Sequence, residues 1–435
     1  TTTMASPTTT TSSSTLPASL ARAESDSSSS ETRSVHVHAY GTRLAWVNGQ
    51  QEVVLYRNGR LEDGELVPAP PQGASPLRPV THVALGRHHS LFVVSNHTVY
   101  GCGSVGNEIV GYDALGTGHT GPATYDVPLR LGSAAEAKTL FPAPSCTVRQ
   151  VAVGLHHSLV LLSNGLLVAC GSNAEGQCGV GVDQYGDPPH RVYRWTPVPV
   201  SLQDPAESVS AIACGPFHAA LLTTHGRPFT WGAAAYGKLG REVGCAHPRL
   251  CPTPAEERVV QVACGAHHTV FLMRTGTVWV CGRGYEGALG TGARRQIVKP
   301  VPTAPVPGVG DGDERVRYVA AGPTSTAVVT TANRLYVTGD AVSCDWRLAT
   351  PCDREETAVA ARTASDPDVH AVACGDHLLL VETIYGALRL IRPAHGVPPL
   401  PLHSPSTPSP RASSSLAHTP VPSLTVRPPP QAPSS

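Results

Sequence analysis

The stretch VVQVACGAHHTVFLMRTGTVWVCG, residues 259–282, decides the fold of this chain. It holds three apolar runs of four to six residues, broken at Gly265 and again at Thr275-Gly276. Runs of this length are typical of strands, because helices in globular proteins usually need ten residues or more. The stretch therefore predicts three consecutive strands joined by short turns.

The same pattern returns along the chain. Clear copies occupy residues 80–103, 148–171 and 209–232, weaker ones 318–339 and 371–391, and a degenerate one 35–56. Each copy has one anchoring glycine, and the seven are Gly41, Gly86, Gly154, Gly215, Gly265, Gly322 and Gly375. A short fourth strand is expected from Pro-Val segments such as residues 196–200. Seven units of four strands predict an all-β fold, a seven-bladed β-propeller.

Two motifs recur with the strands. The first is G-x-x-H-[ST], whose histidines are His89, His157, His218 and His268. The second is G-x-x-x-x-G-x-L-G, seen at residues 171–179, 232–240 and 282–290, with cysteine in place of leucine in the first of these. Together they resemble the regulator-of-chromosome-condensation repeat over residues 35–391, and this resemblance implies the same seven-bladed propeller. The units at Gly41, Gly322 and Gly375 depart from the family pattern, since they lack the histidine.

Composition sets the domain boundaries. Residues 1–34 are dominated by serine and threonine, and residues 396–435 by proline and serine. Neither segment has enough apolar area to offset the entropy of ordering, so both are expected to be disordered tails. The propeller is assigned to residues 35–395. Ring closure requires the last unit to pair with the first, and the fourth strand of unit seven is expected from near Ser34.

The repeated glycines and histidines are interpreted as structural anchors. Glycine is expected where a strand turns sharply, so positive φ is predicted at Gly154, Gly265 and their equivalents. A histidine found once per blade is spread around the ring, and it is expected to bond nearby backbone. The adjacent pairs such as His156-His157 point to opposite faces of a strand and do not suggest one metal site.

The other residues with chemical potential have structural explanations. Six of the twelve cysteines fall at repeat positions and are expected to pack in the core. The loop pairs Cys245/Cys251 and Cys344/Cys352 lack the close spacing of a zinc site. Residues 282–287 match G-x-G-x-x-G, but Ala-Leu-Gly-Thr-Gly follows, which does not start the helix a dinucleotide site needs. No catalytic, cofactor-binding or metal-binding residue is assigned, and no cofactor is expected.

Two long insertions are expected on opposite faces of the ring. If the strands of each blade are labelled A to D from the centre outward, residues 183–195 interrupt a C–D connection. Residues 131–147 follow the predicted D strand 125–129 and belong to a D–A connection. Since neighbouring strands are antiparallel, these two connections lie at opposite ends of the sheets.

The 183–195 insertion is the candidate partner surface. Tyrosine, arginine and tryptophan are the residue types most enriched at binding hot spots. The loop supplies Tyr185, Arg191, Tyr193, Arg194 and Trp195. The alternative is that Tyr193 and Trp195 pack on their own blade and anchor a long loop.

Charge and resemblance frame the function. The formal net charge is zero, which gives no general attraction to nucleic acid or membrane, and no apolar run of a membrane span or secretory signal is seen. We expect an intracellular protein, cytoplasmic or nuclear, with a monomeric propeller.

The first hypothesis is a non-catalytic protein-binding platform. The alternative, implied by the family's namesake, is a guanine nucleotide exchange factor for a Ran-like small GTPase. Chromatin contact is not expected, because residues 1–34 have two arginines against three acids.

Overall fold

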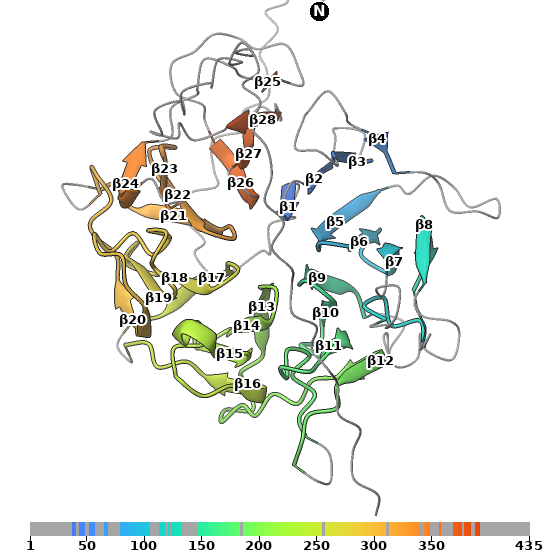
Figure 1. Cartoon of the computed structure of the whole chain (residues 1–435). Coiled ribbons are helices and arrows are strands. Elements are labelled where there is room, and N and C mark those ends of the chain that lie inside the picture. The colour runs from blue at the N-terminus through green and yellow to red at the C-terminus, as the bar shows by residue number, and fades with distance from the viewer. Residues whose placement is uncertain are drawn as a thin grey trace, which may run out of the picture. The chain divides into compact units, whose positions relative to one another are not determined.

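The computed structural model of the 435-residue chain describes the blades and many of their connections. The described residues are 37–40, 43–47, 52–56, 65–67, 79–104, 113–118, 121, 123–131, 146–182, 186–254, 257–309, 313–339, 343–348, 356–357, 369–375, 378–383 and 388–391. They form seven four-stranded antiparallel sheets, the blades, arranged around a common centre (Figure 1).

The first four blades follow the chain in order. Blade 1 comprises β1 (Val37–Tyr40), β2 (Arg43–Val47), β3 (Val53–Tyr56) and β4 (Glu65–Leu66). Blade 2 comprises β5 (Val80–Leu85), β6 (His89–Val94), β7 (Thr98–Ser104) and β8 (Thr124–Arg130). Blade 3 comprises β9 (Val148–Val153), β10 (His157–Leu162), β11 (Leu167–Ser172) and β12 (Arg191–Pro197). Blade 4 comprises β13 (Val209–Cys214), β14 (His218–Thr223), β15 (Pro228–Gly232) and β16 (Cys245–Leu250), with the 3₁₀ turn η2 (Ala235–Gly237) before β16.

The last three blades complete the ring. Blade 5 comprises β17 (Val259–Cys264), β18 (His268–Met273), β19 (Val278–Gly282) and β20 (Ile297–Pro302). Blade 6 comprises β21 (Val316–Ala321), β22 (Ser325–Thr330), β23 (Leu335–Gly339) and β24 (Ser343–Leu348). Blade 7 comprises β25 (Glu356–Thr357), β26 (Val369–Gly375), β27 (Leu378–Thr383) and β28 (Leu388–Ile391). The described residues contain no helix long and apolar enough to span a membrane.

Blade 7 closes differently from the expectation. Its sheet order is β25-β28-β27-β26, so the outermost strand is β25, which precedes the other three in the chain. Glu356 pairs with Leu390 and Thr357 with Arg389. The prediction of a fourth strand from near Ser34 is therefore wrong, because the connection after blade 6 supplies it. The innermost strands β1 and β26 lie side by side where the first blade meets the last.

Burial explains why the B strands are so apolar. Every residue of β10, β14, β18 and β22 is buried, because these strands are covered by a neighbouring blade on each side. The outer strand β8 is mostly exposed. Among the described residues, six buried clusters lie between consecutive blades from blade 1 to blade 7, so this part of the core is a set of interfaces.

The anchoring glycines are needed for space. The φ angles of Gly86, Gly154, Gly215, Gly265 and Gly322 lie outside the left-handed region, so the prediction of positive φ is wrong. A Cβ added to Gly154 would lie 2.6 Å from the carbonyl oxygen of Gly215 in the next blade, and one on Gly265 would lie 2.5 Å from that of Gly322. A side chain here would therefore push two blades apart. Gly41 lies outside the described residues.

The repeated histidines bridge consecutive blades. His89 Nε2 lies 2.8 Å from Ser158 Oγ, and that hydroxyl donates to the Ala114 carbonyl at 2.6 Å. Since the hydroxyl proton is used on the carbonyl, Nε2 of the neutral imidazole supplies the proton between ring and serine. His218 meets Thr269 in the same way. The expectation of a bond to nearby backbone is corrected to a bond across the interface.

This chain of hydrogen bonds, from imidazole to hydroxyl to carbonyl, is called the relay here. It recurs with small changes. His268 Nε2 lies 3.0 Å from Thr326 Oγ1 in blade 6. Blade 1 lacks the histidine, and Arg43 takes its place by donating to Ser90 Oγ at 2.7 Å and to the Gly86 carbonyl at 2.6 Å. The common acceptor in these four pairs is the hydroxyl of the second residue of the neighbouring B strand, which is Ser90, Ser158, Thr269 or Thr326.

Two glutamines join the innermost strands. Gln150 donates from Nε2 to the Ile212 carbonyl at 2.8 Å and accepts from the Ile212 N–H at 2.9 Å. Gln261 makes the same pair of bonds with Val319. These bonds satisfy backbone groups on the cavity-facing strands β13 and β21, which have no sheet partner on that side.

Candidate functional site

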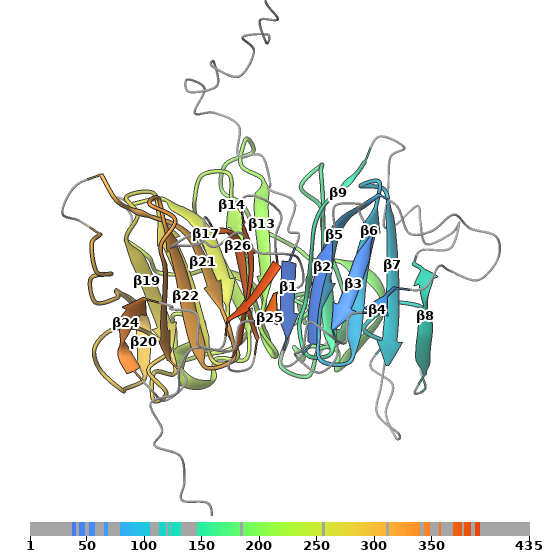
Figure 2. The same cartoon turned by 90° about the horizontal axis from the view of Figure 1, so that it is seen from above.

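The loops form two sets, one at each end of the sheets. Because neighbouring strands are antiparallel, the A–B and C–D connections lie at one end and the B–C and D–A connections at the other. Figure 2 views the sheets edge-on, with turns at both ends. The first end is called the AB/CD face here. It carries the candidate site.

Exposed apolar side chains gather on this face over blades 3 to 5. Five of the ten large hydrophobic residues that are exposed in the described part of the chain lie there. They are Val182 in the C–D loop of blade 3, Phe217, Tyr236 and Val243 in the loops of blade 4, and Tyr285 in blade 5. A concentration of this kind on a folded surface marks a contact site for another molecule.

Cation and ring contacts order the centre of the cluster. The Arg283 guanidinium lies 5.1 Å from the Tyr236 ring centroid and 5.7 Å from that of Tyr285. Glu286 accepts from Arg283 Nε at 3.1 Å and so fixes its direction. Tyr236 also meets His267 edge-to-face at 5.3 Å. Two exposed tyrosines are thereby held in place before any partner arrives, which lowers the entropy cost of binding.

Tyr236 has a strained backbone. Its φ of 64° is in the left-handed region, which is uncommon for an aromatic residue. The equivalent loop position holds Glu175 in blade 3 and Glu286 in blade 5. Backbone strain of this kind clusters at functional sites.

The neighbouring blades present a histidine stack. His88 and His156, from the A–B loops of blades 2 and 3, stack with ring centroids 5.3 Å apart and 2° between the planes. Burial, together with the charges of His88 and Arg87, lowers the pKa of His156 to about 4. The ring of His156 is therefore neutral at pH 7, and the stack carries no repulsion between two cations.

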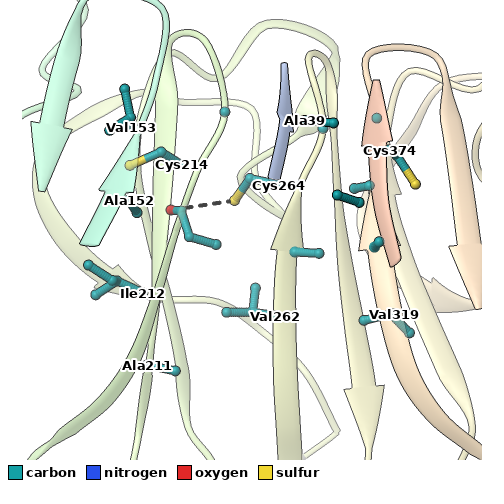
Figure 3. A pocket seen from close by; sticks show the side chains of 18 of the residues that line it. Ala39, Ala152, Val153, Ala211, Ile212, Cys214, Val262, Cys264, Val319 and Cys374 are labelled. Atoms are coloured by element: carbon teal, nitrogen blue, oxygen red, sulfur yellow. Dashed lines mark hydrogen bonds between the residues drawn. The ribbon is translucent and has the colours of Figure 1, made fainter. Parts of the chain in front are cut away.

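The A strands surround a central cavity of about 1160 Å³ (Figure 3). Its wall is largely small and apolar, as at Ala39, Val262 and Val319. The described lining residues include several arginines and histidines and no aspartate or glutamate. An anionic group would meet no carboxylate among these described lining residues.

Three repeat cysteines are placed on that wall. Cys214 and Cys264 line the cavity and are half-buried, whereas the Cys374 side chain is buried. Burial raises the pKa of Cys264 to about 12, so its thiol is protonated at neutral pH. Cys102, Cys170 and Cys281 are buried between blades as expected. In the described residues no three His, Cys, Asp or Glu side chains approach closely enough to hold a metal ion.

The predicted partner loop is only partly a loop. Strand β12 begins at Arg191, so the end of the expected insertion is itself the D strand, in place of residues 196–200. Arg191 and Arg194 are exposed, and Arg191 Nη1 donates to the Tyr193 hydroxyl at 3.2 Å. Trp195 is 5% exposed and packs in the core between blades 2 and 3. Tyr185 lies outside the described residues.

The two insertions fall in the predicted C–D and D–A connections, although residues 191–195 belong to strand β12 and not to the C–D connection. Strand β8 (Thr124–Arg130) is the outermost of blade 2 and β12 the outermost of blade 3. Residues 131–147 therefore form a D–A connection, and residues 173–190 form a C–D connection on the AB/CD face. Residues 132–145 lie outside the described part of the chain.

Sequence reasoning missed the exposed cluster of blades 4 and 5. Tyr236, Arg283 and Tyr285 stand inside the G-x-x-x-x-G-x-L-G segments that carried the repeat assignment. Variation within the motif could have revealed the cluster. The motif positions hold aromatic or charged residues in some units and alanine in others.

Known proteins share the sequence pattern of this chain. A family model described as RCC1-like domain matches residues 12–381. The X-linked retinitis pigmentosa GTPase regulator homolog of Caenorhabditis elegans is 35% identical over 199 residues, which is 45% of this chain and 13% of that protein. The ultraviolet-B receptor UVR8 of Arabidopsis thaliana is 29% identical over 253 residues, 57% of this chain and 53% of the receptor. The chain thus matches well under two thirds of each of these relatives.

A solved structure shares the fold. Prp20p from Saccharomyces cerevisiae, whose binding to Gsp1p and histones was described with its structure, has a TM-score of 0.60 and 18% identity. The match covers 82% of this chain and 81% of that one.

Proposed function

The chain belongs to the family of RCC1-like domains, and from this premise we propose that it is a non-catalytic platform that binds another protein. The partner docks on the AB/CD face of blades 3 to 5. The single observation that carries this proposal is the exposed cluster of Phe217, Tyr236 and Tyr285 in the loops of adjacent blades. Tyrosine with a stacked arginine is the composition of binding hot spots.

The face has the layout of a protein interface. Its centre is aromatic, and the charged pair of Arg283 and Glu286 lies against the tyrosine rings. The loops that carry the rings are short connections between strands of blades 4 and 5, and Arg283, held by Glu286, contacts both tyrosine rings. The exposed arginines Arg191 and Arg194 of β12 extend the same surface at its outer edge in the proposal.

The test compares variants of equal fold. Phe217→Ser with Tyr285→Ser removes two rings from the face, and Leu250→Ser removes an apolar residue that is 52% exposed on the outermost strand β16. Each tagged protein is used to capture partners from the native cell, with quantitation by mass spectrometry. We expect proteins that the double variant loses and the Leu250→Ser control retains. Equal capture by both variants contradicts the assignment of this face.

A second candidate is guanine nucleotide exchange on a Ran-like small GTPase. It is favoured by the match to a relative named a GTPase regulator homolog. An exchange factor works by binding the nucleotide-free GTPase best, which requires no acid–base residue. Release of fluorescent GDP from Ran and from other small GTPases, measured with and without this protein, tests it. Acceleration that the Phe217/Tyr285 double variant loses supports exchange, and unchanged release rates leave the binding platform.

A further inference from the structure

Lys238 is an unusual residue beneath the face. It is 1% exposed, although lysine is among the residues least often buried without a partner. In the G-x-L-G segment of other blades its position holds Ala114, Gln177 or Ala288. Its backbone serves the repeat, since the Lys238 carbonyl accepts from Thr269 Oγ1 at 2.6 Å. The long cationic side chain is therefore not required by the repeat.

The ammonium group has no counter-ion in the described part of the chain. Among the described residues no carboxylate forms an ion pair with Lys238 Nζ, and its nearest aromatic contact is the Phe217 ring, with the centroid 5.9 Å away. Burial lowers the pKa of this lysine, and the more distant Glu175 opposes that effect. A buried cation without a partner destabilises the fold, so its presence calls for an explanation outside stability.

Residues next to Lys238 line the mouth of the central cavity. Lys238 lies where blades 4 and 5 meet, since its ammonium is 5.9 Å from the Phe217 ring centroid of blade 4 and its carbonyl accepts from Thr269 of blade 5. Burial, together with the charge of Lys238, lowers the pKa of both His218 and His267. Phe217 and His267 line the central cavity at its AB/CD end, where the wall has no carboxylate in the described part of the chain. Phe217 is 37% exposed, and its ring is the aromatic group in contact with the Lys238 ammonium.

We propose that Lys238 binds a carboxylate of the partner, from an acidic side chain or a chain terminus, that enters at the cavity mouth between Phe217 and His267. This inference rests on the proposed partner face and specifies the chemistry that the face recognises. On binding, the Phe217 ring moves aside and the carboxylate becomes the missing counter-ion. A charge pair formed inside an interface with low water access contributes to specificity and slows dissociation.

The experiment selects ligands without assuming a partner. A library of random peptides with free carboxyl termini, displayed on phage, is selected on the wild-type full chain, on Lys238→Met and on Lys299→Met. Lys299 is an exposed lysine of β20 and is the matched control. Each selected peptide is resynthesised in two changed forms, one with a terminal amide and one with asparagine or glutamine for its acidic residues, so that the source of the carboxylate is identified.

The outcomes separate the inference from the proposed function. We expect wild type and Lys299→Met to enrich peptides with a required carboxylate, and Lys238→Met to lose them, with a loss of affinity of about tenfold or more for the synthetic peptides. The melting temperature of Lys238→Met should rise, because an uncompensated buried charge is removed.

The carboxylate site is overturned if Lys238→Met still selects peptides that need a carboxylate. It is also overturned if the peptides selected on the wild type show no need for one. If selected peptides also bind the Phe217/Tyr285 double variant normally, the proposed face fails as well. If the double variant loses them while Lys238→Met retains acidic selection, only the carboxylate site is wrong.

Discussion

His157 has no hydroxyl partner in the next blade, because the residue at the repeat position of Ser158 and Thr269 is Ala219. Both ring nitrogens of His157 are buried without a hydrogen bond in the described structure. The carbonyl that the missing hydroxyl would reach, that of Gln177, accepts from Trp231 Nε1 at 2.9 Å instead. The interface between blades 3 and 4 thus keeps the histidine but lacks its relay.

Ala219→Ser should stabilise the protein by restoring that relay. The new hydroxyl can accept from His157 and donate to the second lone pair of the Gln177 carbonyl. A hydrogen bond of this kind contributes about 0.5–1.5 kcal/mol to the free energy of unfolding. Urea denaturation measures it, and Ser158→Ala, which leaves His89 without its partner, is the converse change and should destabilise. A neutral or destabilising Ala219→Ser would mean that the alanine is required for packing.

Gly154→Ala should destabilise through crowding. The added Cβ meets the Gly215 carbonyl at 2.6 Å and the His157 ring, and overpacking of this sort costs about 1–3 kcal/mol. Gly181→Ala is the comparison, because Gly181 has φ of +92° and nothing within 4 Å of an added Cβ. That variant reports backbone strain alone, about 1 kcal/mol. If Gly181→Ala proves the more damaging of the two in thermal unfolding, crowding between blades is not the reason for the anchor.

Stability should fall on acidification. Burial lowers the pKa of His157 to about 3 and of His268 to about 4, from an ordinary value of 6.5. Between pH 6.5 and 4 the unfolded chain therefore binds protons that the native protein does not. The free energy of unfolding decreases as pH falls through this window, by at most about 1.4 kcal/mol per pH unit for each such histidine. Denaturation at pH 7, 6 and 5 gives the slope. His268→Gln should reduce the slope of the free energy of unfolding against pH. An unchanged slope in this variant would contradict the role of His268 in the loss of stability.

The strand β12 variants should separate binding from anchoring. Trp195→Ala should lower stability by about 3–5 kcal/mol, because the indole is buried between two blades. Arg191→Ala with Arg194→Ala changes exposed side chains and should leave the melting temperature nearly unchanged while weakening partner capture. Unaltered capture by this stable double variant would remove β12 from the proposed partner surface.

The fold was predictable because the same sequence pattern occurs in several units of the chain. Strand lengths, the glycine before each B strand and the G-x-L-G segment each recur, so errors in one unit do not alter the count. Blade 7 shows the limit of this reasoning. Its outer strand β25 has two residues and comes from the connection after blade 6, and a pairing of two residues leaves no pattern in the sequence.

The candidate site was less predictable, for a physical reason. The 183–195 segment stood out because its aromatic residues are close together in sequence, yet Trp195 is buried. Phe217, Tyr236 and Tyr285 are separated along the chain by up to 68 residues, and they share one face only because blades 4 and 5 stand side by side. Local composition cannot show such a cluster.

The sequence by itself determined the seven-bladed propeller and its repeated glycine and histidine positions, because periodic apolar runs report strands and their burial directly. It did not determine what those positions do. Only the packing of one blade on the next decided that Gly154 makes room for a carbonyl, that His89 meets Ser158, and that Lys238 lies buried with no ion pair to a described residue. Each of these facts is a contact between residues distant in the chain, and such contacts exist only once the ring is assembled.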